Sequence, residues 1–201
     1  MSTRYYRVPD IRRKLVVIGD GACGKTCLVA VFSQGKFPDI YIPTIFDNFI
    51  TDLEIDDKKV ELAIWDTAGQ EEYDRLRVLS YSNAHAILIC FSLVVPDSLD
   101  NVLEKWVGEA RHFCKDAALI LVGCKADLRY DEEVLQGLRE QKKQPLSGSE
   151  GERVARIIGA KYYIECSAKT GKGVKDVFET ATRESLKVGK KCKKNRKCWI
   201  L

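Results

Sequence analysis

Eight residues near the N-terminus, Gly19 to Thr26, read GDGACGKT and fit the phosphate-binding loop pattern G-x-x-x-x-G-K-[ST]. Backbone N–H groups of such a loop point inward around phosphate oxygens, and its glycines leave the space for them. An apolar run at 15–18 precedes the loop and a predicted helix follows it, whose N-terminus adds a positive end. A glycine-rich turn with a chance lysine is the alternative, and these flanks argue against it. The pattern predicts a phosphate site in which Lys25 reaches the β- and γ-phosphates and Thr26 binds Mg²⁺.

A second polar group lies in the segment WDTAGQ, where Asp66 follows Lys25 by 41 positions. Asp66 ends a predicted strand, the place at which a carboxylate holds Mg²⁺ directly or through water. Gly69 lets a backbone N–H approach the γ-phosphate, and Gln70 can orient a water molecule for in-line attack. An ordinary strand-ending turn is the alternative, and the preceding phosphate loop argues against it. Together the two motifs predict binding and hydrolysis of a nucleoside triphosphate.

Apolar runs and helical patterns alternate along the chain, which predicts an α/β fold. Asp56 and Asp57 form a short turn that indicates a hairpin, whereas the other strands need helical crossovers and hence a mostly parallel sheet. Ligands of such a sheet bind beyond the carboxyl ends of its strands, where Gly19 lies. Ser149 and Glu152 predict a capping box. The predicted strands are 14–19, 49–55, 60–65, 86–91, 119–124 and 162–166, and the predicted helices are 25–32, 98–113, 132–142, 150–158 and 174–188.

The length of 201 residues suits one domain with a sizeable core. No stretch approaches the roughly 20 apolar residues of a membrane-spanning helix. The N-terminus lacks the apolar region of a secretory signal, and Ser2 stands where N-myristoylation requires glycine. Residues 1–11 are predicted to form a basic, flexible arm.

The positive charge of the chain is concentrated in one segment. The net charge is +4, but residues 187–201 hold seven basic residues and no acidic one, which leaves 26 basic against 29 acidic residues in the body. A domain that binds nucleic acid over its surface would not show this distribution.

The eight cysteines are scattered, and several lie within apolar runs, such as Cys90 and Cys166. Without a secretion signal this pattern indicates buried thiols in a reducing cytosol rather than a disulfide framework. No cysteine or histidine spacing indicates a zinc site, and the two histidines, His85 and His112, are expected in solvated or core positions.

The strings GDGACGKT and WDTAGQEEYDRLR, taken together, closely resemble the Rho family of the Ras superfamily of small GTPases, and the resemblance runs from about Arg12 to the C-terminus. It implies a P-loop NTPase fold of the Ras-like G-domain type over residues 12–186, with a six-stranded, mostly parallel sheet and helices on both faces. It also implies a switch that binds GTP or GDP with Mg²⁺ and hydrolyses GTP to GDP.

The segment FPDIYIPTIFDNF, residues 37–49, is similar to the first switch of that family. The resemblance implies that Thr44 completes the Mg²⁺ shell, that Phe37 packs against guanine and that Tyr41 lies over the phosphates. Core aromatics are the alternative for the last two, and the neighbouring prolines favour an exposed loop. The chain departs from the family at 45–49 by swaps that keep charge and bulk. The implied effector region is Tyr41, Ile42, Pro43, Thr44, Ile45, Phe46, Asp47, Asn48 and Phe49.

Residues 71–81 resemble the second switch of the family. Val78 in this segment and Ser82 just after it stand where the family typically has proline. The loop could therefore be more mobile than in the family. Base recognition is implied at 124–127, where Asp127 accepts hydrogen bonds from guanine and the Lys125 stem covers the base. Cys124 stands in place of an asparagine and cannot make its amide hydrogen bonds. Ser167, Ala168 and Lys169 resemble the second guanine motif, with the Ala168 N–H toward guanine O6.

Residues 129–147 match in position the extra helix of the Rho family. The chain ends Cys198-Trp199-Ile200-Leu201, a C-a-a-X pattern whose terminal leucine favours geranylgeranylation of Cys198. One lipid chain binds a membrane only marginally, and the basic run of 187–201 supplies a second signal. A solvated tail or a nuclear address is the alternative for that run, and palmitoylation of Cys192 stays open.

The resemblance thus implies a set of site residues, cofactors and partners. GTP or GDP is the ligand and Mg²⁺ the cofactor. The partners are an exchange factor, a GTPase-activating protein, a dissociation inhibitor, effectors such as kinases or formins, and an anionic membrane, with no nucleic acid and a monomeric chain. The expected location is the cytoplasmic face of the plasma membrane, with a cytosolic pool. The catalytic residues are Gln70, Lys25 and Thr44; the metal ligands are Thr26, Thr44 and Asp66; the nucleotide-binding residues are Gly19, Asp20, Gly21, Ala22, Cys23, Gly24, Lys25, Thr26, Cys27, Phe37, Tyr41, Thr44, Asp66, Gly69, Cys124, Lys125, Asp127, Ser167, Ala168 and Lys169.

Two other functions remain open from the sequence. A module that stays loaded with GTP and barely hydrolyses it would typically lack the glutamine or carry an altered loop, and Gly21 and Gln70 are both present. A nucleoside kinase would share only the phosphate loop, and nothing in the chain supports an acceptor site for it. The resemblance also implies a role in actin organisation and polarised growth, and in wall synthesis if the chain is fungal.

Overall fold

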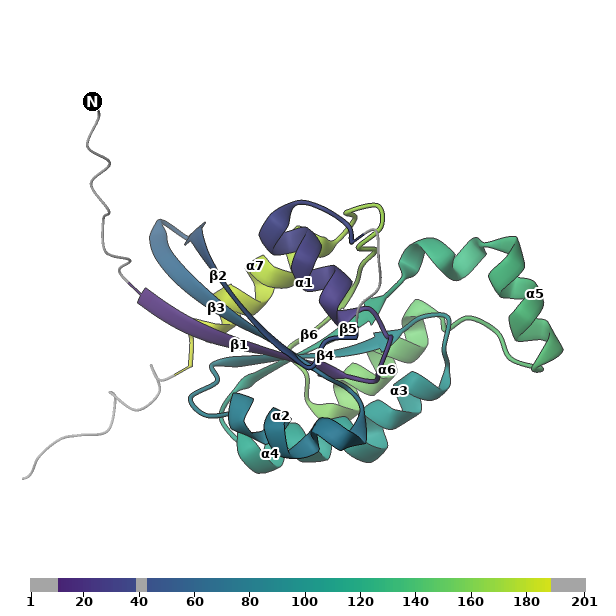
Figure 1. Ribbon diagram of the computed structural model, residues 1–201, viewed down its shortest axis with the longest axis horizontal. Coiled ribbons are helices and arrows are strands. Elements are labelled where there is room, and N and C mark those ends of the chain that lie inside the picture. The colour runs from purple at the N-terminus through teal and green to yellow at the C-terminus, as the bar shows by residue number, and fades with distance from the viewer. Residues whose placement is uncertain (1–10, 39–42, 189–201) are drawn as a thin grey trace, which may run out of the picture.

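The computed structural model describes residues 11–38 and 43–188. Its centre is one six-stranded sheet in the order β2-β3-β1-β4-β5-β6 (Figure 1). Only β2 and β3 pair in an antiparallel way, joined at Asp56 and Asp57, so the predicted hairpin and the mostly parallel sheet are confirmed. The strands are β1 (Ile11–Gly19), β2 (Phe46–Ile55), β3 (Lys58–Thr67), β4 (Ala86–Ser92), β5 (Ala118–Cys124) and β6 (Tyr162–Glu165).

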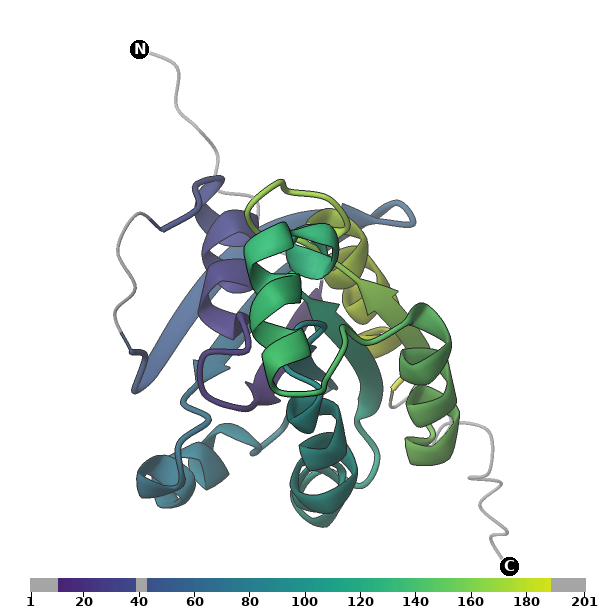
Figure 2. The same cartoon turned by 90° about the vertical axis from the view of Figure 1, so that its right-hand side faces the viewer.

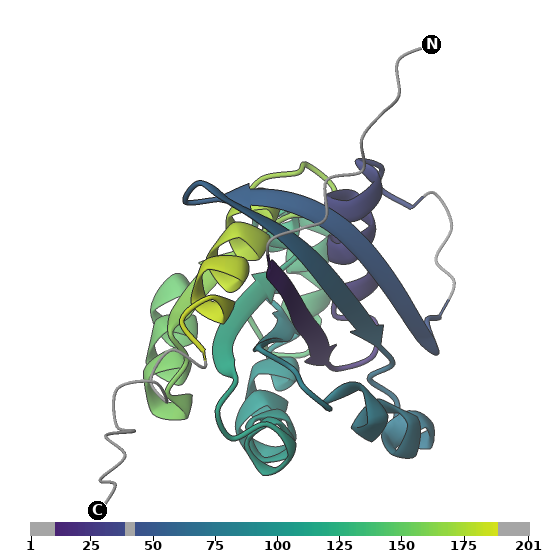
Figure 3. The ribbon, with the colours of Figure 1, turned by 90° about the vertical axis from the view of Figure 1, so that its left-hand side faces the viewer.

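Helices cover both faces of this sheet. Helices α1 and α7 pack on one face, and α3, α4 and α6 pack on the other, together with α2 (Figures 1 and 2). The edge strand β2 lies on the same side of the molecule as α7 (Figure 3), and Arg183 near the end of α7 donates to Asp56, which follows β2, at 3.3 Å. The α-helices are α1 (Lys25–Gln34), α2 (Asp74–Ser80), α3 (Asp97–Asn101), α4 (Val107–Phe113), α5 (Glu132–Glu140), α6 (Gly148–Ile158) and α7 (Val174–Ser185); η1 (Glu71–Tyr73) and η3 (Ala126–Tyr130) are 3-10 turns, and η2 (Val102–Trp106) is a π-helical turn.

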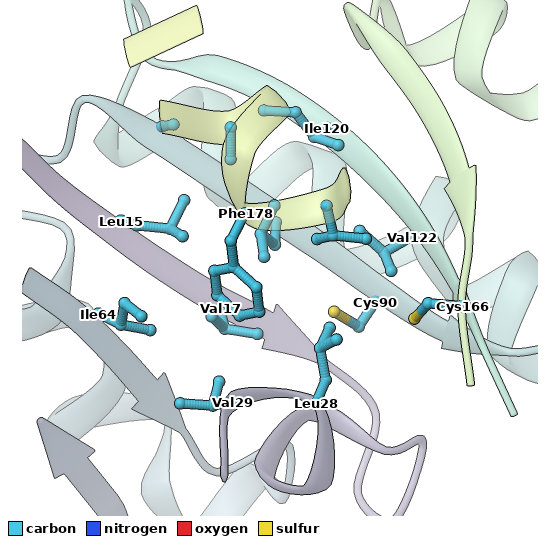
Figure 4. Packing of buried hydrophobic residues seen from close by; sticks show 14 of the residues in the cluster. Leu15, Val17, Leu28, Val29, Ile64, Cys90, Ile120, Val122, Cys166 and Phe178 are labelled. Carbon is cyan, nitrogen blue, oxygen red and sulfur yellow. The ribbon is translucent and has the colours of Figure 1, made fainter. Parts of the chain in front are cut away.

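The core explains why the central strands are apolar throughout. Every residue of β4 and β5 is buried, as expected for strands that are covered on both faces. On the α1 and α7 face, Phe178 lies among Leu15, Val17 and Leu28 (Figure 4). Each such side chain contributes about 1.5–3 kcal/mol when it leaves water. This packing fixes β1 and α1, and thus the loop between them.

Local details differ from the predictions where tertiary contacts decide them. Helix α6 begins at Gly148, so its capping box is Ser147 with Glu150 and the predicted pair Ser149 and Glu152 was wrong; the Glu150 carboxylate accepts from the Ser147 N–H at 2.8 Å. Strand β2 begins at residue 46 because its polar residues pair with β3. Helix α2 was not predicted, and the helix predicted at 98–113 contains a π-helical turn.

The described cysteines are all free thiols, and five of the six are buried. This agrees with the prediction of buried thiols. Within the described ranges, no helix combines the length and the apolar character needed to cross a bilayer.

Candidate functional site

The loop that joins β1 to α1 lies at the carboxyl end of the sheet, where the strand order predicts a ligand site. Gly19 has φ +139°, and a Cβ there would lie 2.0 Å from the Cys90 carbonyl oxygen. A Cβ on Gly69 would lie 2.3 Å from the Gly19 carbonyl oxygen and 2.4 Å from the Gly21 nitrogen. Only glycine fits at both positions. The two motifs that the sequence singled out are therefore in direct backbone contact.

The ammonium group of Lys25 is held at this loop. The side chain is 5% exposed, and Nζ donates to the carbonyl oxygens of Gly19 at 2.9 Å and Asp20 at 2.7 Å. Lys25 is also the first residue of α1, whose N-terminal end carries positive potential. A buried cation beside the N-terminal end of a helix is suited to a polyphosphate.

Thr26, Thr44 and Asp66 come together from three elements. The hydroxyl oxygens of Thr26 and Thr44 lie 2.6 Å apart. Asp66 is fully buried, and neither of its carboxylate oxygens has a hydrogen-bond partner among the described residues. Burial is the main cause that raises the pKa of Asp66 to about 6, against the opposing effects of Thr26 and Lys25. A buried, unpartnered carboxylate beside two hydroxyls is a set of hard oxygen donors, which fits Mg²⁺.

Gln70 lies over the same loop. A Cβ on Gly21 would lie 3.6 Å from Cδ of Gln70, so this side chain is in van der Waals range of the loop. A cavity of about 300 Å³ is lined by Lys25, Thr26, Thr44 and Gln70 together with Phe37 and Lys125. The structure therefore brings the predicted catalytic side chains and two of the three predicted metal ligands, Thr26 and Thr44, to one cavity, whereas the buried Asp66 does not line it.

A second cavity of about 260 Å³ adjoins the first and shares Gly24, Cys27, Phe37 and Lys125 with it. It is formed by the residues after β5 and β6, which are tied together because the Ala126 N–H donates to the Cys166 carbonyl at 3.1 Å. Lys125 has φ +63°, which turns the chain so that Asp127 lines the cavity. Ser167 accepts the Thr170 N–H at 3.1 Å and holds the second loop. The other lining residues are Leu28, Cys124, Leu128, Cys166, Ala168 and Lys169.

Cys124 is 3% exposed and lines the second cavity. A Cβ on Gly24 would lie 3.2 Å from the Cys124 Cβ, and its thiol interacts with those of Cys90 and Cys166. The neighbouring thiols of Cys166 and Cys90 are the main causes that lower the pKa of the Cys124 thiol, against the opposing effect of burial. The residue therefore packs the phosphate loop against β5 rather than offering an amide to a ligand.

The side chain of Asp20 lines neither cavity, although the residue belongs to the phosphate-binding motif. Its carboxylate accepts from Asn101 Nδ2 at 2.7 Å and from Trp106 Nε1 at 2.6 Å, away from the cavity. Only its backbone remains available to the predicted phosphate site. Sequence reasoning identified neither Asn101 nor Trp106. Asn101 lies 81 positions and Trp106 lies 86 positions after Asp20, and no motif marks contacts over such separations.

Arg77 is a further residue to which the sequence patterns assigned no role. It is 1% exposed and donates to the Ala68 carbonyl at 2.9 Å, to Glu109 at 2.7 Å and 3.0 Å, and to Asp74 at 2.5 Å. These hydrogen bonds outweigh the opposing effect of burial, and the pKa of Arg77 is raised. Arg77 thus ties α2 to the end of β3 and to α4.

The other residues singled out from the sequence lie at the surface or outside the residues that the structure describes. Ile45 is 53% exposed, and β2, which follows it, forms one edge of the sheet. Helix α5 projects at the periphery, with Asp131 accepting the Val134 N–H at 3.1 Å as its cap (Figure 1). Tyr41, Ile42, Cys192, Cys198 and the arm at 1–10 lie outside the described residues.

Comparisons with known proteins agree with the nucleotide site that the geometry indicates. A family model described as the Ras family matches residues 14–187. The chain is 62% identical over 192 residues to the GTP-binding protein RHO1 of Candida albicans, which covers 96% of this chain and 97% of that protein. It is 58% identical over 208 residues to Rho1 of Kluyveromyces lactis, covering both chains in full, and 57% identical over 202 residues to RHO1 of Saccharomyces cerevisiae, covering 96% and 97%.

Proposed function

Because the chain belongs to the Ras family, and within it to the fungal Rho-type small GTPases, which bind and hydrolyse GTP, we propose that it works as a membrane-tethered switch. Its two states would be read through residues 41–49 and 71–81. The observation that carries this proposal is the convergence of Lys25, Thr26, Thr44 and Gln70 on one cavity. Loss of γ-phosphate contacts on hydrolysis would release both segments.

The proposed phosphate end uses the loop at 19–26 and a bound Mg²⁺. Lys25 neutralises charge on the β- and γ-phosphates, while Thr26, Thr44 and Asp66 hold the metal. Mg²⁺, when bound, neutralises charge that develops on the bridging oxygens. The buried carboxylate of Asp66 supports this role because it has no other partner among the described residues.

In the proposed hydrolysis, Gln70 orients the attacking water, and we assign no arginine among residues 11–38 and 43–188 to the reaction. Arg77 supports this view because Ala68, Asp74 and Glu109 already engage its guanidinium. An activating protein would provide the missing cation. Intrinsic turnover should then be slow, about 10⁻⁴ s⁻¹ by analogy with Ras, and rise steeply with that partner.

At the proposed base end, Asp127 accepts from guanine N1–H and the exocyclic amine, which adenine cannot offer as a pair. Lys125 and Phe37 cover the two faces of the base, and the Ala168 N–H donates to guanine O6. The adjoining cavity that Asp127, Lys125, Phe37 and Ala168 line supports this arrangement.

Regulators and effectors act on GTPases of this family, and the specific partners are proposals. We assign an exchange factor, an activating protein, a dissociation inhibitor, and kinases or formins as effectors that bind the region from Tyr41 to Phe49. The cellular role would be actin organisation, polarity and cell wall synthesis. We place the protein at the cytoplasmic face of the plasma membrane, with a cytosolic pool. Geranylgeranylated Cys198 and the basic run of 187–201 would tether it there.

The test replaces Gln70 by leucine, which removes the amide that orients water but keeps the bulk of the side chain. Nucleotide binding should be unchanged, and single-turnover hydrolysis of bound GTP should nearly cease. Hydrolysis is measured in the GTP-loaded full chain, with Gln141→Leu as the matched control at the end of α5. Equal rates for Gln70→Leu and the parent would refute the assigned role.

A module that stays loaded with GTP is the alternative, and the nucleotide carried by the purified protein distinguishes the two. Chromatography of the released nucleotide should find mostly GDP if the chain turns over GTP. Mostly GTP would favour the static module. The presence of Gln70 in the same cavity as Lys25 favours turnover.

A further inference from the structure

The phosphate loop contains one acidic side chain, Asp20, and two hydrogen bonds hold it away from the cavity. Its carboxylate accepts from Asn101 Nδ2 at 2.7 Å and from Trp106 Nε1 at 2.6 Å. Its own carbonyl oxygen accepts from Lys25 Nζ at 2.7 Å. The same residue therefore contacts both the phosphate-binding lysine and the helical segment after β4.

A carboxylate at this place opposes the binding of a polyphosphate unless it is directed elsewhere. Like charges repel, and the repulsion grows as water is excluded from the site. Hydrogen bonds from neutral donors to a charged acceptor are stronger than those between neutral groups. Asn101 and Trp106 thus supply two strong bonds that only one direction of the Asp20 side chain can satisfy.

The π-helical turn explains how Asn101 and Trp106 reach the same carboxylate. They are five residues apart, and an α-helix would place them about 140° apart around its axis. In η2 the Val107 N–H donates to the Val102 carbonyl, an i→i+5 bond that widens the turn and brings such pairs onto one face. The loop after β1 passes beside this helical segment (Figure 1). Turns of this kind are frequent at functional sites.

The indole of Trp106 is fixed from several sides. It is 1% exposed, the guanidinium of Arg77 lies 4.8 Å from its ring centroid, and Lys105 Nζ lies 4.9 Å from it. Arg77 in turn donates to the Ala68 carbonyl beside Gly69. A rigid indole gives the N–H a defined direction toward Asp20, and the ring contacts with Arg77 and Lys105 do not need that N–H.

We propose that Trp106 and Asn101 are positioning residues that hold the Asp20 carboxylate away from the phosphates and thereby set how tightly the loop retains its nucleotide. The inference rests on the proposed role of residues 19–26 as the phosphate-binding loop. It goes beyond that role because it assigns a charge-directing function to side chains outside every nucleotide-binding motif. Release of the carboxylate would weaken nucleotide binding through charge, not through loss of packing.

The first experiment measures the dissociation rate of a fluorescent GDP analogue from the full chain with Mg²⁺. Trp106→Phe removes the N–H donor and keeps a ring against Arg77, so the rate should rise about tenfold, which corresponds to about 1.4 kcal/mol. Trp65→Phe is the matched control, since Trp65 contacts Lys14 and Phe46 and not Asp20. An unchanged rate in Trp106→Phe would overturn the inference.

A double-mutant cycle separates charge from packing. In an Asp20→Asn background the acceptor carries no charge, so Trp106→Phe should raise the rate less than threefold. If the tenfold rise persists in that background, the effect is one of packing and the inference is wrong. Asn101→Ala, at a half-exposed site, repeats the cycle with an expected threefold rise should Trp106→Phe fail to fold. A parent protein that retained no GDP would instead contradict the proposed function, and this inference with it.

Discussion

The phosphate end and the base end of the candidate site are built in different ways. At the phosphate end the charged groups are buried, since Lys25 is 5% exposed and Asp66 is fully buried, and main-chain carbonyl oxygens hold the Lys25 ammonium group. At the base end, side chains on two loops line the cavity, and Phe37 is 40% exposed. One end is therefore a charged, rigid cradle, and the other is a largely apolar slot with one acceptor, Asp127.

This difference indicates how binding energy is distributed. Groups that are buried and charged interact strongly with a charged ligand because little water screens them. An apolar slot contributes through contact area and a few directed hydrogen bonds, which serve discrimination more than affinity. We therefore expect substitutions at the phosphate end to cost affinity for any nucleotide, and those at the base end to cost the choice of base.

The largest effect is expected for Lys25→Ala. The substitution removes the ammonium group, so the nucleotide would lose two charge-assisted contacts to its phosphates. Each contact is worth about 1.5–3 kcal/mol, so GDP affinity should fall by roughly 10²–10⁴-fold. Titration calorimetry with GDP and with IDP should show the same loss for both. Lys115→Ala, at the opposite end of β5, serves as the control. A loss below tenfold would mean that the buried cation is not what binds the phosphates.

Asp127→Ala should have a smaller and more selective effect. Two hydrogen bonds to guanine are lost, which predicts roughly 30-fold weaker GDP binding, at about 1 kcal/mol for each bond. IDP lacks the exocyclic amine, so the parent should prefer GDP to IDP and the variant should bind both almost equally. Competition between the two nucleotides measures this ratio. A preserved preference for GDP would remove Asp127 from base recognition.

The phosphate end and the base end of the candidate site also differ in how much of their structure could be predicted from the sequence. The loop at 19–26 follows from local backbone requirements, which a motif records directly, whereas the close approach of Gly69 to that loop was not predicted. The six strands, the hairpin and the mostly parallel sheet follow from apolar runs and crossover rules, whereas the order of the strands was not predicted. Strand and helix ends were less accurate, because pairing partners and caps such as Ser147 decide them.

What sequence reasoning missed depends on contacts between distant residues. Arg77 and Trp106 look like ordinary helical residues, and burial against Glu109 and Asp20 gives them their roles. The direction of the Asp20 side chain needs a π-helical turn, for which the chain has no local pattern. Cys124 was recognised as a departure from the family, but its packing against Gly24 and two other thiols appears only in the fold.

Cys124→Asn tests whether the base end is weaker because of this departure. An amide at this position can hydrogen-bond to the base or to the loop at Gly24, each bond worth about 1 kcal/mol, so GDP should bind about fivefold more tightly. Cys166→Ser, which adds no amide, is the control for loss of a thiol in the same cluster. Unchanged or weaker GDP binding in Cys124→Asn would mean that packing between Gly24 and β5 outweighs the added hydrogen bond.

The smallest effect on binding is expected behind the base end, at Glu165. Its carboxylate accepts from both Nη atoms of Arg129 at 2.6 Å and from the Tyr163 hydroxyl at 2.7 Å, and so anchors η3, which carries Asp127. Glu165→Gln should lower the free energy of unfolding by about 1–2 kcal/mol. GDP affinity should change by about twofold, because the phosphate end is untouched.

The pH dependence of that loss distinguishes an ion pair from simple packing. Burial acts to raise the pKa of Glu165, but the hydrogen bonds from Arg129 and Tyr163 outweigh it, and the pKa lies below its usual value. A carboxyl whose pKa falls on folding stabilises the fold above its unfolded pKa, about 4.3, and loses this as pH drops through the folded value. Denaturant unfolding of GDP-saturated protein should therefore show the gap between parent and Glu165→Gln at pH 7, and the gap should narrow as the pH falls below about 4.3. Glu140 is exposed, and Glu140→Gln, the control, should show no such gap. A gap for Glu165→Gln that does not depend on pH would mean that Arg129 anchors η3 by contact alone.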